Sequence, residues 1–209
     1  MNIQQYIERR EREFEKLGKN GVAVFDLRPF LNLRIKATLL SELLFCISTA
    51  NSRAISGLKF QKLLEGKDLK KFSFEDFVNA LKVSGVRFYN IKANYMVDSI
   101  KNFDSVLKVL KKDDKKAREM LAEQIKGFGF KEASHFLRNV GRKNVAIIDR
   151  HVLHWLRKHG YINNTYKNLS KANYLRIENL LKDVAKKKKI NLVKLDLMIW
   201  YEATGMVLK

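Results

Sequence analysis

The chain is poor in the residues that build cross-links, sharp bends and membrane spans. It has one cysteine, Cys46, one proline and ten glycines among 209 residues. A single cysteine excludes an internal disulfide, a thiolate zinc cluster and a four-cysteine iron–sulfur cluster. No apolar run approaches the roughly 18 residues of a membrane span. The charged N-terminus also lacks the apolar stretch of a signal peptide, so we expect a cytoplasmic protein that does not enter a membrane.

Acidic residues are scarce relative to basic ones. There are 42 lysines and arginines against 22 aspartates and glutamates, which gives a formal net charge of +20 at pH 7. This excess is larger than solubility requires, and it favours a polyanionic partner, either nucleic acid or an anionic membrane surface. Abundant lysine is also typical of hyperthermophile proteins, which is a second explanation of the same charge.

The scarcity of glycine and proline favours helices joined by short turns, and no alternating strand pattern persists along the chain. Apolar residues from Ile35 to Ile47 recur at helical spacing. Ser73, with Asp76 three residues later, predicts an N-cap and a helix to about residue 83. Asp149 is expected to cap a later helix. Further helices are expected near residues 90–100, 113–125, 130–140, 171–185 and 192–203. The sequence therefore predicts an all-α fold.

The stretch IKGFGFK, residues 125–131, places two glycines directly before a helix. Gly127 and Gly129 can both adopt positive φ, which would turn the chain sharply and leave backbone N–H groups open. Amides at a helix N-terminus can hold a phosphate oxygen, so this hairpin can bind a DNA backbone without reading its sequence. An ordinary turn between two helices can carry the same glycines, so the hairpin alone does not decide the function.

Lys131 follows the hairpin directly, and Asp149 comes eighteen residues later. A ten-residue helix carries the chain about 15 Å away, and seven extended residues can bring it back, so the two side chains can lie close together. An uncharged amine beside a carboxylate suits attack at C1′ of a nucleotide, with displacement of the base and formation of a Schiff base. Taken singly, Lys131 could be one more surface lysine and Asp149 a plain N-cap.

Four longer stretches carry a resemblance to a known family: ELLFCISTANSRAISGLKFQKLL, GVRFYNIKANYMV, GFGFKEASHFLRNVG and WYEATGMVLK. With the hairpin and its spacing to Asp149, they resemble the archaeal-type 8-oxoguanine DNA glycosylase/AP lyases of the helix-hairpin-helix superfamily, from about residue 20 to the last residue. The resemblance implies two helical subdomains flanking a cleft, residues 34–141 and residues 1–33 plus 142–209. It also implies a monomer that excises 8-oxoguanine from double-stranded DNA and cuts the abasic strand by β-elimination.

The resemblance also assigns roles to residues. It makes Lys131 the Schiff-base nucleophile and Asp149 the catalytic carboxylate, and it places Asn51 in the space left by the flipped nucleotide. The expected DNA contacts are Asn51, Arg53, Gly127 and Gly129, and the expected base-pocket residues are Phe88, Trp200 and Lys209. Either aromatic ring could instead belong to the core. Lys209 would act through its main chain, although a chain terminus is usually frayed.

No catalytic metal and no iron–sulfur cluster are expected, because the four histidines have no cysteine or aspartate cluster beside them. The hairpin carbonyls could hold a structural alkali-metal ion. Two other functions stay open at this point. One is a glycosylase of the same fold that acts on another damaged base, and the other is a non-catalytic helix-hairpin-helix DNA-binding protein.

Overall fold

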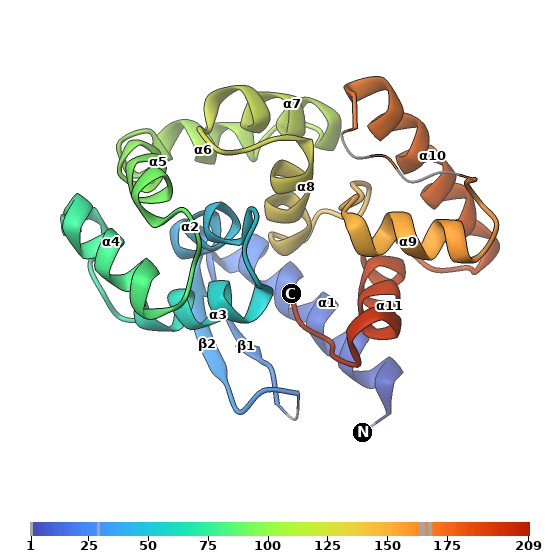
Figure 1. Cartoon of the computed structure of the whole chain (residues 1–209), viewed down its shortest axis with the longest axis horizontal. Helices are drawn as coiled ribbons and strands as arrows, with labels where there is room; N and C mark the ends of the chain where they lie inside the picture. The colour runs from blue at the N-terminus through green and yellow to red at the C-terminus, as the bar shows by residue number, and fades with distance from the viewer. Residues whose placement is uncertain (1, 29, 164–165, 167–168) are drawn as a thin grey trace.

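The computed structural model of the chain describes residues 2–28, 30–163, 166 and 169–209. In chain order the helices are α1 (Ile3–Asn20), α2 (Leu39–Thr49), α3 (Ala54–Leu63), η1 (Leu69–Lys71), α4 (Phe74–Val83), α5 (Tyr89–Lys101), α6 (Phe103–Val109), α7 (Asp114–Gln124), α8 (Phe130–Asn139), α9 (Arg150–Lys158), α10 (Lys171–Lys187) and α11 (Leu192–Thr204). In Figure 1, α2–α5 lie on one side, α9–α11 lie on the other, and α8 lies between them. This helical architecture confirms the predicted all-α class. None of the described helices is long and apolar enough to cross a membrane.

Helix starts follow the capping residues that the sequence indicates. The Ser73 and Asp76 pair forms a capping box at α4: Ser73 Oγ accepts the Asp76 N–H at 3.1 Å, and Asp76 Oδ2 accepts the Ser73 N–H at 2.9 Å. Asp149 Oδ1 accepts the N–H groups of His151 and Val152 at 2.9 Å each, so the predicted N-cap of α9 is confirmed. These bonds satisfy amides that have no partner inside the helix.

A short β-hairpin precedes α2, so the expectation that the chain has no strand pattern was wrong at this point. β1 (Val22–Asp26) pairs antiparallel with β2 (Arg34–Thr38), with Val22 opposite Thr38 and Asp26 opposite Arg34. Ile35, which helical spacing had placed in a helix, lies in β2. Its neighbours in the strand do alternate between buried and exposed, but five residues are too few to separate the two periods by pattern alone. Helix α6 was also not predicted.

The core consists of two hydrophobic clusters. The larger one gathers Phe14 of α1, Phe25 of β1, Phe45 of α2 and Phe136 of α8 with many aliphatic neighbours. The smaller one is formed by α9, α10, α11 and the segment before α9. Helix α11 contributes to both. The division of the chain into residues 34–141 and residues 1–33 plus 142–209 stays a prediction.

A buried ion pair joins α7 to α10. Arg118 and Glu178 are 2% and 3% exposed, and Arg118 Nη2 donates to Glu178 Oε2 at 3.0 Å. Glu178 Oε1 also accepts the Ala146 N–H at 2.9 Å, just before α9. The guanidinium lies over the rings of Phe130 and Tyr174. This pair therefore fixes the start of α8 and the segment before α9 relative to each other.

Replacing Glu178 with alanine is expected to lower the free energy of unfolding by about 3–5 kcal/mol, because Arg118 would stay buried without its partner. Lys182→Ala is the matched control. Lys182 reaches the same carboxylate at 3.6 Å but is 44% exposed, so its loss should cost less than about 1 kcal/mol. Urea unfolding followed by circular dichroism measures both variants, and equal losses would contradict the special role of the buried pair.

Candidate active site

The hairpin between α7 and α8 is built around Gly127. This residue has a φ of +85°, and a Cβ placed on it would lie 2.5 Å from Tyr95 Cδ2 of α5. Lys126 Nζ pairs with Asp98 of the same helix at 2.7 Å. The hairpin thus packs directly on α5, and a glycine is required at its tightest point. Gly129 differs from the expectation: its φ of −106° and ψ of −168° are extended, so the predicted positive φ there was wrong.

Glu132 occupies the N-terminus of α8. Its Oε2 accepts the Gly129 N–H at 3.3 Å, and its Oε1 pairs with Lys131 Nζ at 2.9 Å. The Gly129 amide is therefore not open, and a DNA phosphate would compete with this carboxylate for it. The Lys131 side chain is 33% exposed, so a substrate can reach its amine. Glu132 was missed at the sequence level, although its position three residues after the N-cap is typical of a capping box.

Asp149 lies at the N-terminus of α9, and its charge acts on a partly buried ion pair. Arg138 of α8 pairs with Asp196 of α11 at 3.2 Å. Burial raises the pKa of Asp196 to about 6, the charge of Arg138 opposes this, and the charge of Asp149 adds to it. The charge of Asp149 is therefore felt at the junction of α8 and α11. The ion pair of Lys131 is with Glu132 and not with Asp149, and the approach of Lys131 to Asp149 stays a prediction.

The two candidate base-stacking rings differ in exposure. Phe88, directly before α5, is 51% exposed and has a φ of +58°, so the core alternative is wrong for this ring. Trp200 of α11 is half-buried and meets His151 edge to face at 5.0 Å. Its Nε1 is buried without a hydrogen-bond partner among the described residues. In Figure 1, α5 and α11 lie on opposite sides of the molecule, and whether both rings contact one base stays a prediction.

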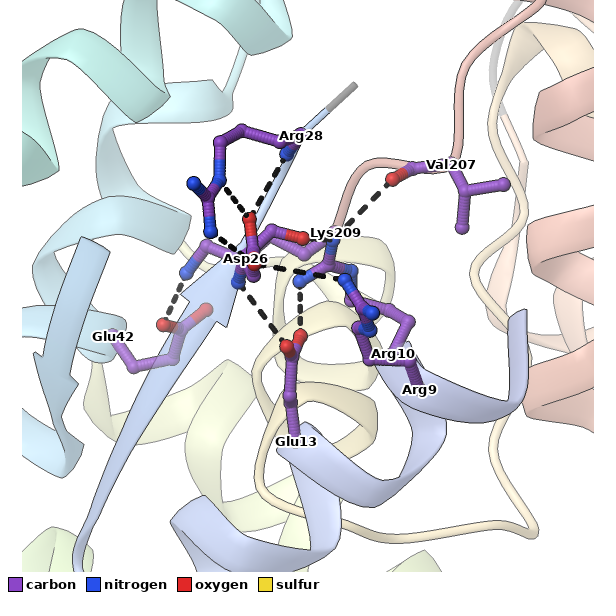
Figure 2. A network of polar contacts seen from close by, with 8 residues as sticks. All are labelled: Arg9, Arg10, Glu13, Asp26, Arg28, Glu42, Val207 and Lys209. Carbon is purple, nitrogen blue, oxygen red and sulfur yellow. Dashed lines mark hydrogen bonds and ion pairs between the residues drawn. The ribbon is translucent and has the colours of Figure 1, made fainter. Parts of the chain in front are cut away.

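The C-terminus is fixed in the interior, as Figure 2 shows. Lys209 is 6% exposed, its Nζ pairs with buried Glu42, and the ammonium lies 4.3 Å and 4.1 Å from the ring centroids of Phe25 and Phe45. Arg10 Nη2 donates to Val207 O at 3.5 Å. A frayed end, the usual expectation for a terminus, is therefore wrong here.

The last residue lies against the helix that carries Lys131. The backbone of Lys209 faces the ring of His135, four residues after Lys131 on α8. Burial holds the pKa of His135 well below its ordinary value, and the Lys209 backbone acts against this effect. Residues four apart share one face of a helix. The main chain of Lys209 is thus placed beside the face of α8 that carries Lys131.

The turn between α2 and α3 presents the other candidate DNA contacts. Asn51 is exposed with a φ of +52°, and exposed Arg53 follows as the N-cap of α3. Beneath the turn lies Lys92 of α5, which is 4% exposed and was missed at the sequence level. Its Nζ donates to the carbonyls of Ser48 at 2.8 Å and Ala50 at 2.6 Å. One lysine in a chain with 42 basic residues carries no sequence signal that sets it apart.

Comparison with known proteins shows the family to which a chain with this geometry belongs. A family model described as 8-oxoguanine DNA glycosylase, of the helix-hairpin-helix type, matches residues 24–190. The chain belongs to this family. It is 40% identical to the 8-oxoguanine DNA glycosylase/AP lyase of Aquifex aeolicus over 214 residues, covering 99% of this chain and 94% of that protein. It is 46% identical to the enzyme of the same name from Methanocaldococcus jannaschii over 170 residues, covering 80% of this chain and 81% of that one.

Solved structures confirm the helix-hairpin-helix glycosylase fold for this family member. The crystal structure of the M. jannaschii 8-oxoguanine DNA glycosylase has a TM-score of 0.84 at 40% identity, covering 100% of this chain and 91% of that one. The M. jannaschii glycosylase/lyase in complex with a 15mer DNA containing 8-oxoguanine has a TM-score of 0.85 at 39% identity, covering 100% and 94%.

The lowered pKa of Lys92 predicts that the free energy of unfolding of this glycosylase family member rises at alkaline pH. Burial, and then the positive charges of Lys131 and Arg87, lower its pKa from 10.5 to about 8. Between these values the unfolded chain keeps a proton that the folded chain has released, so raising the pH favours the folded state.

The measurement is urea unfolding of the wild type and of Lys92→Met at several pH values from 7.5 to 10. The stability of the wild type relative to the variant should rise by about 1–2 kcal/mol between pH 8 and pH 10. Other groups titrate in both proteins and cancel in the difference. Parallel curves would show that Lys92 keeps an ordinary pKa in the folded chain.

Proposed function

We propose that this chain is a bifunctional DNA glycosylase/AP lyase that excises 8-oxoguanine from double-stranded DNA and then cleaves the abasic strand by β-elimination. The observation that carries the proposal is the position of Lys131: a reachable amine at the N-terminus of α8, directly after the hairpin that packs on α5. Family membership and the names of the relatives support the substrate. The charge of +20 suits a DNA duplex.

The chemistry begins with the loss of a proton from the Lys131 ammonium, and Glu132 Oε1 at 2.9 Å is placed to accept it. The neutral amine attacks C1′ of the damaged nucleotide, a C–N bond forms, and the bond to the base breaks with its electron pair leaving on the base. The nitrogen then loses a proton, the C1′–O4′ bond breaks as the nitrogen lone pair forms the imine bond, O4′ takes up a proton, and a protonated Schiff base results. Loss of a proton from C2′ expels the 3′-phosphate, and water finally hydrolyses the imine to free Lys131.

Asp149 stabilises the positive charge that develops on the sugar as the base leaves. Its position is fixed by the two capping bonds that Oδ1 accepts from His151 and Val152. A carboxylate held in this way needs little reorganisation during the reaction. The non-catalytic alternative gives no reason for an amine and a carboxylate at the N-termini of two consecutive helices.

An extruded base must be stacked and recognised by its edge. Phe88 and Trp200 are the proposed stacking partners, and such contacts contribute about 1–3 kcal/mol per base. 8-Oxoguanine carries a hydrogen at N7 where guanine has a lone pair, so a hydrogen-bond acceptor at that edge distinguishes them. The main chain of Lys209 is the proposed acceptor, supported by its burial and its position against His135.

The protein is proposed to act as a monomer on the duplex, with Asn51, Arg53 and the hairpin contacting the DNA. A structural alkali-metal ion at the hairpin carbonyls stays part of the proposal. Ile125 O already accepts the Phe128 N–H at 3.0 Å, and because a carbonyl oxygen has two lone pairs, this bond leaves room for a cation.

Borohydride trapping tests the nucleophile, because reduction captures an imine only where one forms. Wild type should give a covalent adduct with an 8-oxoguanine duplex, and Lys131→Gln should give none while its DNA affinity falls by less than about tenfold, the effect of one phosphate contact. Lys126→Gln is the control, since it removes an exposed hairpin lysine paired with Asp98. An adduct in Lys131→Gln would contradict the assignment. A panel of duplexes with other lesions separates 8-oxoguanine from other damaged bases.

Asp149→Asn tests the carboxylate. The amide oxygen can still accept both capping bonds, so the free energy of unfolding should change by less than about 1 kcal/mol. Base release in single turnover should slow by about a hundredfold or more, because the charge beside the sugar is lost. Cleavage rates on 8-oxoguanine duplexes and thermal unfolding measure the two effects. Unchanged base release would remove Asp149 from the mechanism.

A further inference from the structure

Lys92 is a buried cation that neutral oxygens hold. Its Nζ donates to Ser48 O, Ala50 O and Ser52 Oγ at 2.8, 2.6 and 3.0 Å. Among the described residues no carboxylate forms an ion pair with it. Burying a charge without an opposite charge is costly, and here three hydrogen bonds to neutral oxygens offset only part of that cost. A lysine at this position therefore stabilises the fold less than the number of its hydrogen bonds suggests.

The first turn that Lys92 holds is the one that presents Asn51. Ser48 and Ala50 lie at the C-terminal end of α2, where carbonyls lack partners inside the helix and a cation is favoured. Ala50 and Ser52 are the direct neighbours of Asn51, and both bind the same ammonium. Asn51 itself keeps an exposed side chain and a positive φ of 52°. The ammonium thus holds the residues on both sides of this exposed side chain, Ala50 by its carbonyl and Ser52 by its hydroxyl.

The second turn is the one that presents Phe88. The Lys92 N–H donates to Phe88 O at 3.1 Å, and Ser52 Oγ accepts the Arg87 N–H at 3.0 Å. A φ of 58° is unusual for a bulky residue such as Phe88, and it persists only where the surroundings hold it. The bond to Phe88 O comes from the main chain of Lys92, so any residue at this position makes it. The ammonium therefore holds the Asn51 turn directly and reaches the Phe88 turn through Ser52 Oγ.

We propose that Lys92 is a positioning residue that couples the two turns, so that Asn51 and Phe88 act as one rigid unit when the damaged nucleotide leaves the duplex. The inference rests on the proposed function, which assigns Asn51 to the vacated space and Phe88 to the extruded base. An ammonium has three donors for the three acceptors present, and a methionine of similar length has none. Lys92 acts through the backbone of the turns and does not itself touch the base.

The test compares two substrates with Lys92→Met. Excision of 8-oxoguanine from a duplex should fall by about tenfold or more, because the two turns are no longer held in fixed positions relative to each other. Cleavage of a duplex that already contains an abasic site needs no base to be extruded, and should change by less than about threefold. The fluorescence rise of a 2-aminopurine beside the lesion, which reports unstacking on binding, should shrink in the variant.

Two further variants keep the test decisive. Lys101→Met removes an exposed lysine from the same helix and should leave both rates unchanged. Ser52→Ala keeps the charge of Lys92 but removes the hydroxyl that both turns share. It should therefore show the same selective loss of 8-oxoguanine excision to a smaller extent. If Lys92→Met does not fold, Ser52→Ala replaces it in the test. Equal losses on both substrates, or no loss, would overturn the inference. A wild-type protein that fails to excise 8-oxoguanine would instead overturn the proposed function.

Discussion

The carboxylate of Glu42 lies fully buried in α2, and the donors that satisfy it bring together segments from along the whole chain. Gln61 of α3 and Asn139 of α8 donate to it at 2.9 and 2.6 Å, and the ammonium of Lys209 completes the set. A buried carboxylate left without a counter-charge and donors is strongly destabilising, so the convergence of these segments stabilises the fold. The same convergence places the C-terminal main chain against α8, which carries Lys131.

The basic residues that give the large positive charge have different roles, which depend on whether they are buried or exposed and on which groups they contact. Arg118 and Lys209 are buried against carboxylates and hold the fold together. Lys92 is buried against neutral oxygens, a costly arrangement that lies beneath two strained turns. Lys131 is partly exposed beside Glu132. Most other cations face solvent, where they favour contact with a polyanion at little cost to stability.

Close packing at the hairpin explains how a helix N-terminus can meet DNA in a defined position. Gly127 lets the chain pass against Tyr95, and Lys126 reaches Asp98, so α5 supports the hairpin from behind. Because α5 also begins at the Phe88 turn and carries Lys92, one helix supports the hairpin, the aromatic turn and the Asn51 turn. A displacement of α5 would therefore move three proposed DNA contacts together.

The sequence by itself determined the all-α class, the caps at Ser73 and Asp149, the hairpin at Gly127 and the spacing from Lys131 to Asp149. Capping and turn chemistry act within a few residues, so local patterns are enough to predict them. The tertiary structure alone decided the burial of Lys209, the place of Lys92 beneath two turns and the exposure of Phe88. These depend on contacts between residues far apart in the chain, and a pattern of neighbouring residues does not encode which distant groups a buried charge will meet. Ile35 shows the same limit at short range, because a strand of five residues can be told from a helix only by the partner strand that pairs with it.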